Sequence, residues 1–226
     1  MEIQKSNIAF VTLLLAAIAG FCDTTTFVAA KEIFSAHVTG NFIVFAYEIV
    51  KGGDASALLK LITFPVFIMA VIAGGEIANQ TRKKYLLLFI QGILLLFTGL
   101  AVYALQRTGI YFEGWPMYTS TMFIVFAMGL QNAFGKLFAK ETYGPTTMMT
   151  GNVTQASLDI GDIMNVSSPH HNEASASLRK QTVTIVGFLI GCLLGAIMGK
   201  SIGLVAVCLP GITLIVYCLL TNKLKS

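Results

Sequence analysis

The chain has 226 residues, of which 55% are hydrophobic and 12% are charged, and its formal net charge is +4. A water-soluble domain carries about a quarter charged residues, so this composition excludes a soluble globular protein. The lysines and arginines cluster at the ends of apolar blocks and form no basic face interleaved with aromatic residues, which argues against nucleic-acid binding.

Six apolar blocks are long enough to cross a lipid bilayer as helices, which takes roughly 20 residues. In chain order they are Ile8–Ala30, Leu61–Ala78, Tyr85–Leu105, Met117–Ala139, Val183–Leu204 and Val205–Leu220. Two shorter blocks, Val38–Val50 and Thr147–Met164, begin with polar residues and contain acids, and the polar stretch Asn165–Gln181 is predicted to be a loop. The sequence therefore predicts an all-α polytopic membrane protein with a single membrane domain over residues 1–226.

The positive charges predict how the helices cross, because cytoplasmic loops carry an excess of Lys and Arg. With six crossings and the amino terminus inside, ten of these residues lie inside and five outside. With eight crossings the counts become eight and seven, and the bias disappears. We expect six transmembrane helices, two short re-entrant or broken helices and two cytoplasmic termini. Eight crossings are the alternative, since an extended stretch plus a short helix can also span.

One polar motif occurs twice, with its elements in the same order and at nearly the same spacing. The first copy comprises Gly20–Asp23, Ala30–Glu32, Thr39–Asn41 and Glu48–Ile49, and the second comprises Gly129–Asn132, Ala139–Glu141, Thr150–Asn152 and Asp159–Ile160. Four matched elements indicate a duplication, with repeat 1 at about 8–106 and repeat 2 at about 117–221. Three long spans in each repeat would turn the second copy upside down. Such inverted repeats are common in secondary transporters, whose sites lie at the repeat interface.

Each Thr-Gly-Asn element follows a stretch that is poor helix, and we expect it to begin a short helix with Thr or Asn as the cap. The free N–H groups of such an end suit a polar or anionic solute. Seven residues later each copy has an acid on the same helix face as its Asn. A lipid-facing carboxylate is expensive, so these acids should face the interior or an aqueous cavity. The candidate solute- or ion-binding residues are Asp23, Thr39, Gly40, Asn41, Glu48, Asn132, Thr150, Gly151, Asn152 and Asp159.

Asp23 is the first candidate for a proton- or cation-linked residue, because the equivalent residue of the second copy is the amide Asn132. The alternative is structural, since Asn and Thr often join membrane helices by hydrogen bonds worth about 1 kcal/mol or less. Glu48 and Asp159 lie near the ends of their blocks, where they could simply reach the membrane interface.

Several other features have simpler structural interpretations. Glycines recur every fourth residue from Gly187 to Gly199, which predicts a close helix-packing surface, within the chain or across a homodimer. His37 has no counterpart in the second copy, which indicates a local role. The adjacent histidines His170 and His171 lie in a polar stretch and are expected to be solvated, and the four cysteines are expected to pack as small apolar residues. No metal site or cofactor is predicted.

The segments Gly20-Phe-Cys-Asp23, Val38-Thr-Gly-Asn41, Gly129-Leu-Gln-Asn132 and Met149-Thr-Gly-Asn152 resemble the YoaK-like family of bacterial membrane proteins (DUF1275). The resemblance runs from about Ala17 to the last span and implies a six-span protein of the inner membrane. One departure is Thr24, because members of the family typically carry Ala after the Asp.

The main hypothesis is a small secondary transporter, in contact with the lipid bilayer, for a small polar or anionic solute bound between the two Thr-Gly-Asn helix ends. Asp23 would couple a proton or cation, and Asn41, Asn132 and Asn152 would orient the solute. One alternative is an intramembrane enzyme that uses Asp23 and Glu48 as acid and base, although no nucleophile–base pair is evident. The other is a non-catalytic membrane assembly or sensing protein in which the repeats only pack.

Overall fold

The computed structural model describes residues 2–52, 57–81, 83–109, 114–165 and 167–221, and these residues form helices and turns with no strand. The predicted all-α class is therefore confirmed. In chain order the helices are α1 (Glu2–Ala29), α2 (Gly40–Val50), α3 (Leu58–Thr81), α4 (Leu86–Arg107), α5 (Trp115–Leu137), α6 (Met149–Met164), α7 (His171–Ile202) and α8 (Cys208–Leu220), with a 3-10 turn, η2 (Gly203–Val207), before α8.

Four helical stretches of the described chain are long and apolar enough to cross a membrane. They are α1 from Asn7 onward, α3, α4 and the continuous stretch from α7 to α8. This is the architecture of an integral membrane protein. Helix α5 has 23 residues but is less apolar, and polar side chains such as Thr121 and Gln131 are buried in it. Most of the surface of α5 is in contact with other helices and not with lipid, so α5 can carry polar side chains.

The polar stretch Asn165–Gln181 is not the predicted loop, because α7 already begins at His171. The segment from His171 to Val186 contains neither Gly nor Pro, and Ala174 is buried in this polar part of the helix. Helix α6 packs along α7, so a tertiary contact stabilises the polar first part of α7, which precedes the apolar block. The predicted last span is also shorter, since Gly203 has φ 62° and α8 begins only at Cys208.

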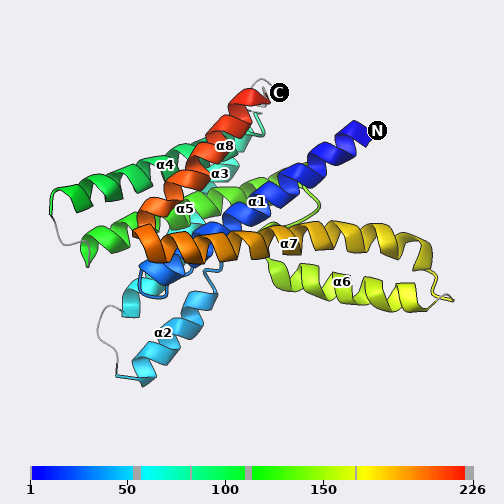
Figure 1. Cartoon of the computed structure of the whole chain (residues 1–226), viewed down its shortest axis with the longest axis horizontal. Coiled ribbons are helices and arrows are strands. Elements are labelled where there is room, and N and C mark those ends of the chain that lie inside the picture. Colours follow the sequence, from blue (N-terminus) through cyan, green and yellow to red (C-terminus); the bar gives the residue numbers. More distant parts are fainter. Residues whose placement is uncertain (1, 53–56, 82, 110–113, 166, 222–226) are drawn as a thin grey trace.

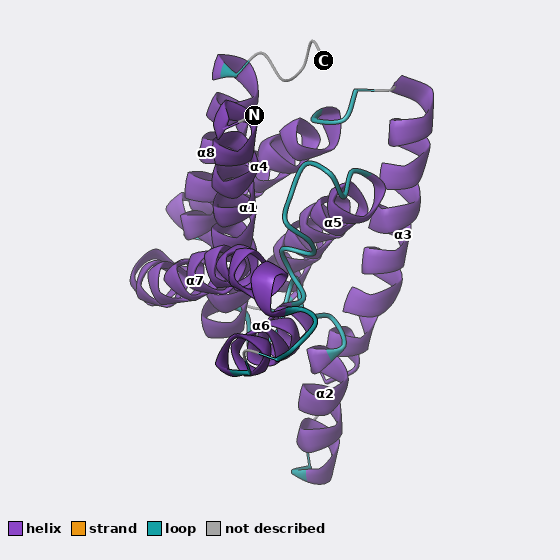
Figure 2. Ribbon diagram, turned by 90° about the vertical axis from the view of Figure 1, so that its right-hand side faces the viewer, coloured by secondary structure: helices purple, strands orange, loops and turns teal. Residues whose placement is uncertain are grey.

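The two short blocks form helices that project from the central bundle (Figure 1). Helix α2 lies below the bundle and packs on α3, while α6 runs beside the polar half of α7 (Figure 2). Each short helix thus forms a hairpin with the long helix that follows it in the chain.

Helix α1 crosses the centre of the molecule and packs along α7. The glycine stripe of α7 faces α1 of the same chain: the backbone of Ala17 lies opposite Gly191, and that of Phe21 lies opposite Gly195. A Cβ added at Gly191 would lie 2.0 Å from the carbonyl oxygen of Ala17. The stripe is therefore a packing surface within the chain, which was one of the two predicted alternatives.

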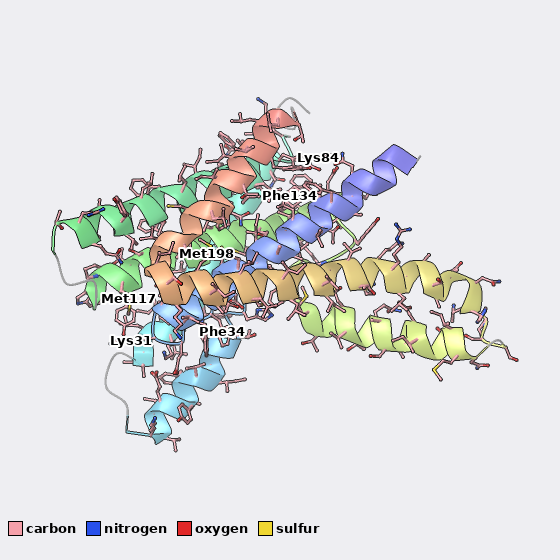
Figure 3. The ribbon with its side chains drawn as sticks, viewed as in Figure 1. Lys31, Phe34, Lys84, Met117, Phe134 and Met198 are labelled. Carbon is pink, nitrogen blue, oxygen red and sulfur yellow. The ribbon has the colours of Figure 1, made fainter. Side chains whose placement is uncertain are left out.

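The remaining contacts place α5 along α3 and α8 along α4. Gly129 of α5 lies against Ala70 of α3, as Gly20 of α1 lies against Phe188 of α7. The core between these helices contains the fully buried side chains of Leu95, Met128 and Phe134, the last of which is labelled in Figure 3. The glycines of both copies of the motif thus allow close approach of two helices.

Candidate functional site

The first candidate segment is the non-helical stretch between α1 and α2. It begins with Lys31 (φ 52°) and Glu32 (φ 61°), two residues in the left-handed region, which costs about 1–2 kcal/mol per residue. The carbonyl of Lys31 accepts a hydrogen bond from the ammonium group of the buried Lys60. Lys31 and Phe34 lie at the carboxyl end of α1 (Figure 3). A contact with α3 thus helps to hold this strained turn.

Asp23 joins this segment to α1. Its side chain is buried, and its Oδ1 accepts hydrogen bonds from the backbone N–H groups of Ala36 (2.7 Å) and His37 (3.2 Å). Its Oδ2 lies 2.6 Å from Nδ1 of His37. His37, which has no counterpart in the second copy, is therefore the direct partner of the strongest candidate residue.

Asn41 closes the same segment from the other side. Its Oδ1 accepts a hydrogen bond from the N–H of Phe34, and its Nδ2 donates to the carbonyl of Phe34, both at 2.8 Å. Nδ2 also donates to Oγ1 of Thr63 on α3 at 2.9 Å. Both Asn41 and Thr63 are fully buried. Asn41 therefore satisfies backbone groups that would otherwise lie unpaired next to lipid.

The predicted side-chain caps are wrong for both short helices. Thr39 stands at the cap position of α2 and Met148 at that of α6, and neither makes a capping hydrogen bond. At the start of α2 the N–H groups of Gly40 and Asn41 donate to the carbonyls of His37 and Val38. The backbone turn before α2 thus uses these two donors, which weakens the case for an anion at this helix end.

The second copy repeats the same connections with neutral groups. Oδ1 of Asn132 accepts a hydrogen bond from Oγ1 of Thr147 at 2.7 Å, where Asp23 of the first copy binds the backbone of Ala36. Nδ2 of Asn152 donates to the carbonyl of Pro145 (3.1 Å), seven residues earlier, as Asn41 does to Phe34. Both Thr-Gly-Asn elements therefore lie at the start of their short helices and tie down the preceding segment.

A pair of buried glutamines belongs to the same region and was missed in the sequence. Gln91 of α4 donates to Oε1 of Gln131 (2.8 Å), and Gln131 donates to the carbonyl of Leu15 (2.8 Å) and to Thr146 (3.1 Å). The signal was present, because Gln91 is the single polar side chain between Leu86 and Leu96. These contacts attach the non-helical stretch between α5 and α6, the second segment, to α1, α4 and α5.

The two segments lie at different heights along α1. The N–H of Tyr143, in the second segment, donates to Oγ1 of Thr12, whereas the first segment is held by Asp23. Eleven residues of α-helix separate these anchor points, which corresponds to about 17 Å along the axis.

The two acids of the motif face the long helix of their own hairpin and have different surroundings. Glu48 lies 3.0 Å from the ammonium group of Lys60 on α3, a buried lysine that was not among the predicted site residues. Asp159 is also buried; its Oδ1 accepts a hydrogen bond from Gln155, and its Oδ2 has no partner in the described structure. The remaining predicted residues, Thr150 and Gly151, lie in the first turn of α6.

The family model described as Protein of unknown function (DUF1275) matches residues 11–220. The chain belongs to this family. The match covers both copies of the motif, most of α1 and all the helices from α2 to α8, so the resemblance of the four motif segments to DUF1275 proteins extends over most of the chain. No curated protein and no solved structure matches the chain.

The contacts of the two asparagines predict unequal effects on stability. Asn41→Ala removes both partners of the Phe34 backbone and is expected to cost about 2–4 kcal/mol, because unpaired buried polar groups cost about 1–3 kcal/mol each. Asn152→Ala is expected to cost about 1 kcal/mol, since mainly a carbonyl contact to Pro145 is lost. Thermal unfolding of both variants in detergent measures the difference, and equal losses would contradict the role given to Asn41.

Proposed function

We propose that this DUF1275 protein is a secondary transporter that moves a small polar solute with a proton. The observation that carries the proposal is the pair of Asp23 and His37, which joins a buried carboxyl group on a long helix to a non-helical segment next to it. Irregular backbone at membrane depth is tolerated where it is buried in protein or lines an aqueous cavity. Secondary transporters build their sites from such interrupted helices.

The helix pairs support an arrangement of two inverted repeats, 8–106 and 117–221. Helix α1 pairs with α7, α5 with α3, α2 with α3, α6 with α7, and α4 with α8. The first four helices of the chain correspond to the last four in order, α1 to α5 through α4 to α8. Under this correspondence the α1–α7 pair becomes α5–α3, the α2–α3 pair becomes α6–α7, and the α4–α8 pair becomes itself. An approximate two-fold axis between the repeats accounts for this pattern.

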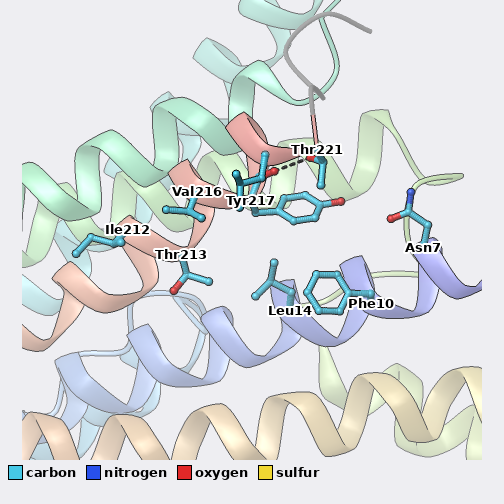
Figure 4. A pocket seen from close by; sticks show the side chains of 9 residues that line it. Asn7, Phe10, Leu14, Ile212, Thr213, Val216, Tyr217 and Thr221 are labelled. Carbon is cyan, nitrogen blue, oxygen red and sulfur yellow. Dashed lines mark hydrogen bonds between the residues drawn. The ribbon is translucent and has the colours of Figure 1, made fainter.

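A difference between the repeats supports alternating access. Helix α4 packs along α5, whereas the equivalent helices α8 and α1 make few contacts and flank an apolar groove of about 750 Å³ (Figure 4). The groove at the equivalent place beside α4 and α5 has a volume of about 290 Å³. In transporters with inverted repeats, one repeat rocks against the other around a fixed site. Unequal packing at equivalent places fits one end state of such a motion.

The proposed topology has six spans in the inner membrane, with both termini on the cytoplasmic side. Asn7 near the start of α1 and Thr221 after the end of α8 line the same groove (Figure 4). The two ends of the described chain therefore lie at the same end of the bundle, as an even number of crossings requires. The excess of positive residues assigned to that side gives the orientation.

Within this framework Asp23 and His37 bind the proton, and the two Thr-Gly-Asn segments form the solute path along α1. In the second copy the amide Asn132 takes the place of Asp23 and His37 has no counterpart, so the titratable pair belongs to the first copy. A polar solute fits the amide and hydroxyl groups of the segments. An anion is less suited, since the first N–H groups of α2 are already bound to backbone carbonyls.

Proton flux into proteoliposomes tests this proposal. The purified protein is reconstituted with a pH-sensitive dye inside, and amino acids, nucleobases, small amines and organic acids are added outside in turn. At least one solute is expected to acidify the interior, and the signal should disappear with a proton ionophore. Solute uptake that is the same with and without a proton gradient would contradict proton coupling.

A further inference from the structure

A second polar site lies away from Asp23, between α6 and the polar half of α7. This hairpin projects from the bundle (Figure 1) and encloses a groove of about 540 Å³. The lining includes three carboxyl groups, Asp159 and Asp162 from α6 and Glu173 from α7. Among the described lining residues the one basic side chain is His170, with no Lys or Arg. The groove therefore attracts a cation.

Asp159 supplies an unused acceptor in this groove. The residue is 3% exposed, its Oδ1 accepts a hydrogen bond of 2.9 Å from Gln155, and its Oδ2 has no partner among the described residues. Asp162 accepts a hydrogen bond from Ser168 at 2.6 Å. A buried carboxyl oxygen without a partner is costly, so a donor that arrives in the groove would gain this interaction.

The first copy of the motif indicates what kind of donor fits. Glu48 occupies the position equivalent to Asp159, and its partner is the primary ammonium group of Lys60 on the neighbouring long helix. In the α6–α7 hairpin no described lysine lines the groove. A ligand with a primary ammonium group would take at Asp159 the place that the protein's own lysine takes at Glu48.

The remainder of the lining favours an aliphatic chain with more than one ammonium group. Leu158 and Ala174 add apolar surface to the same lining, which suits the methylene groups of an aliphatic chain. A bound metal ion needs several ligands that converge on one point, and no group of three His, Cys, Asp or Glu side chains in the described chain does so. We propose that this groove binds a small aliphatic di- or polyamine.

Calorimetric titration of the purified full-length protein with spermidine and with putrescine tests the site. We expect saturable binding that weakens at least about tenfold in Asp159→Asn, because hydrogen bonds to charged groups contribute about 1.5–3 kcal/mol. Glu173→Gln, on the exposed rim, is expected to weaken binding severalfold without affecting the fold. Glu76→Gln is the matched control, since it removes an exposed carboxylate from α3, outside the groove, and should leave the affinity unchanged.

Three outcomes would overturn the proposal. The first is no saturable binding of either amine, and the second is binding that neither Asp159→Asn nor Glu173→Gln weakens. The third is Mg²⁺ binding with equal affinity and equal sensitivity to both variants, which would make the groove a metal site. Unfolding midpoints without ligand identify a variant that has failed to fold, in which case Glu173→Gln decides. Amine binding here does not depend on proton-coupled transport, so either proposal can fail alone.

Discussion

Replacing Asp23 by Asn is expected to abolish proton-coupled uptake and to leave the protein folded in membranes. An amide oxygen at this position can still accept the two hydrogen bonds from the backbone of Ala36 and His37. The second copy already carries Asn132 at the equivalent point, so the fold tolerates an amide there. The change removes only the titratable carboxyl group. Solute-driven acidification of proteoliposomes, measured with the solute found for the wild-type protein, gives the result.

Asp23→Ala provides the comparison that separates transport from folding. Alanine leaves two N–H groups without their acceptor, and each unpaired group is expected to cost about 1–3 kcal/mol. The unfolding midpoint in detergent should therefore fall clearly in Asp23→Ala and little in Asp23→Asn. Normal proton-coupled uptake by Asp23→Asn would remove Asp23 from the coupling mechanism. An equal loss of stability in both variants would assign the carboxyl group a purely structural role.

Replacing Gly191 by Ala is expected to separate α1 from α7 and to destabilise the protein by about 3 kcal/mol or more. The added Cβ would lie 2.0 Å from the carbonyl oxygen of Ala17 and 2.7 Å from its carbonyl carbon. Backbone atoms cannot rotate away as a side chain can, so one helix has to shift, and overpacking of this kind typically costs about 1–3 kcal/mol and occasionally more. The α1–α7 contact is among the most extensive in the molecule.

Gly75→Ala is the matched control for this prediction. Gly75 also lies within a long helix, α3, but no atom lies within 4 Å of an added Cβ. Alanine has the higher helix propensity by about 1 kcal/mol, so this variant should be neutral or slightly more stable. Detergent-based thermal unfolding of the two variants provides the measurement. Equal midpoints would show that α7 does not depend on close contact with α1.

Much of the helical framework could be predicted because lipid imposes a strong constraint on sequence. A helix in contact with lipid must be apolar over about 20 residues, and α1, α3 and α4 satisfy this condition visibly. This requirement for apolar residues does not apply where a helix contacts protein in place of lipid. The polar start of α7 at His171 could not be recognised, because α6 rather than an apolar block of its own stabilises it.

Part of the candidate site could also be predicted from the sequence, because the motif is duplicated. The duplication pointed to Asp23, Asn41, Asn132 and Asn152, and each of them makes hydrogen bonds to the non-helical segment of its own copy or to a helix that borders it. The side chains of Asn41 and Asn152 bind backbone groups seven residues earlier in the chain, which differs from the predicted role of orienting a solute at free helix ends. The sequence around Lys60 suggests an exposed lysine. Its burial depends on the turn at Lys31, whose conformation could not be predicted from the local sequence.

Composition, block length and repetition are properties of the linear chain, so they are enough to identify a helical membrane protein with a duplicated polar motif. Which groups meet depends on how the chain folds. The pairing of Asp23 with His37 and of Glu48 with Lys60 arises from contacts between segments that are separated in sequence, as does the burial of Asp159. The two copies of the motif already differ in sequence at Asp23 and Asn132, and the partners supplied by the fold add a further chemical difference.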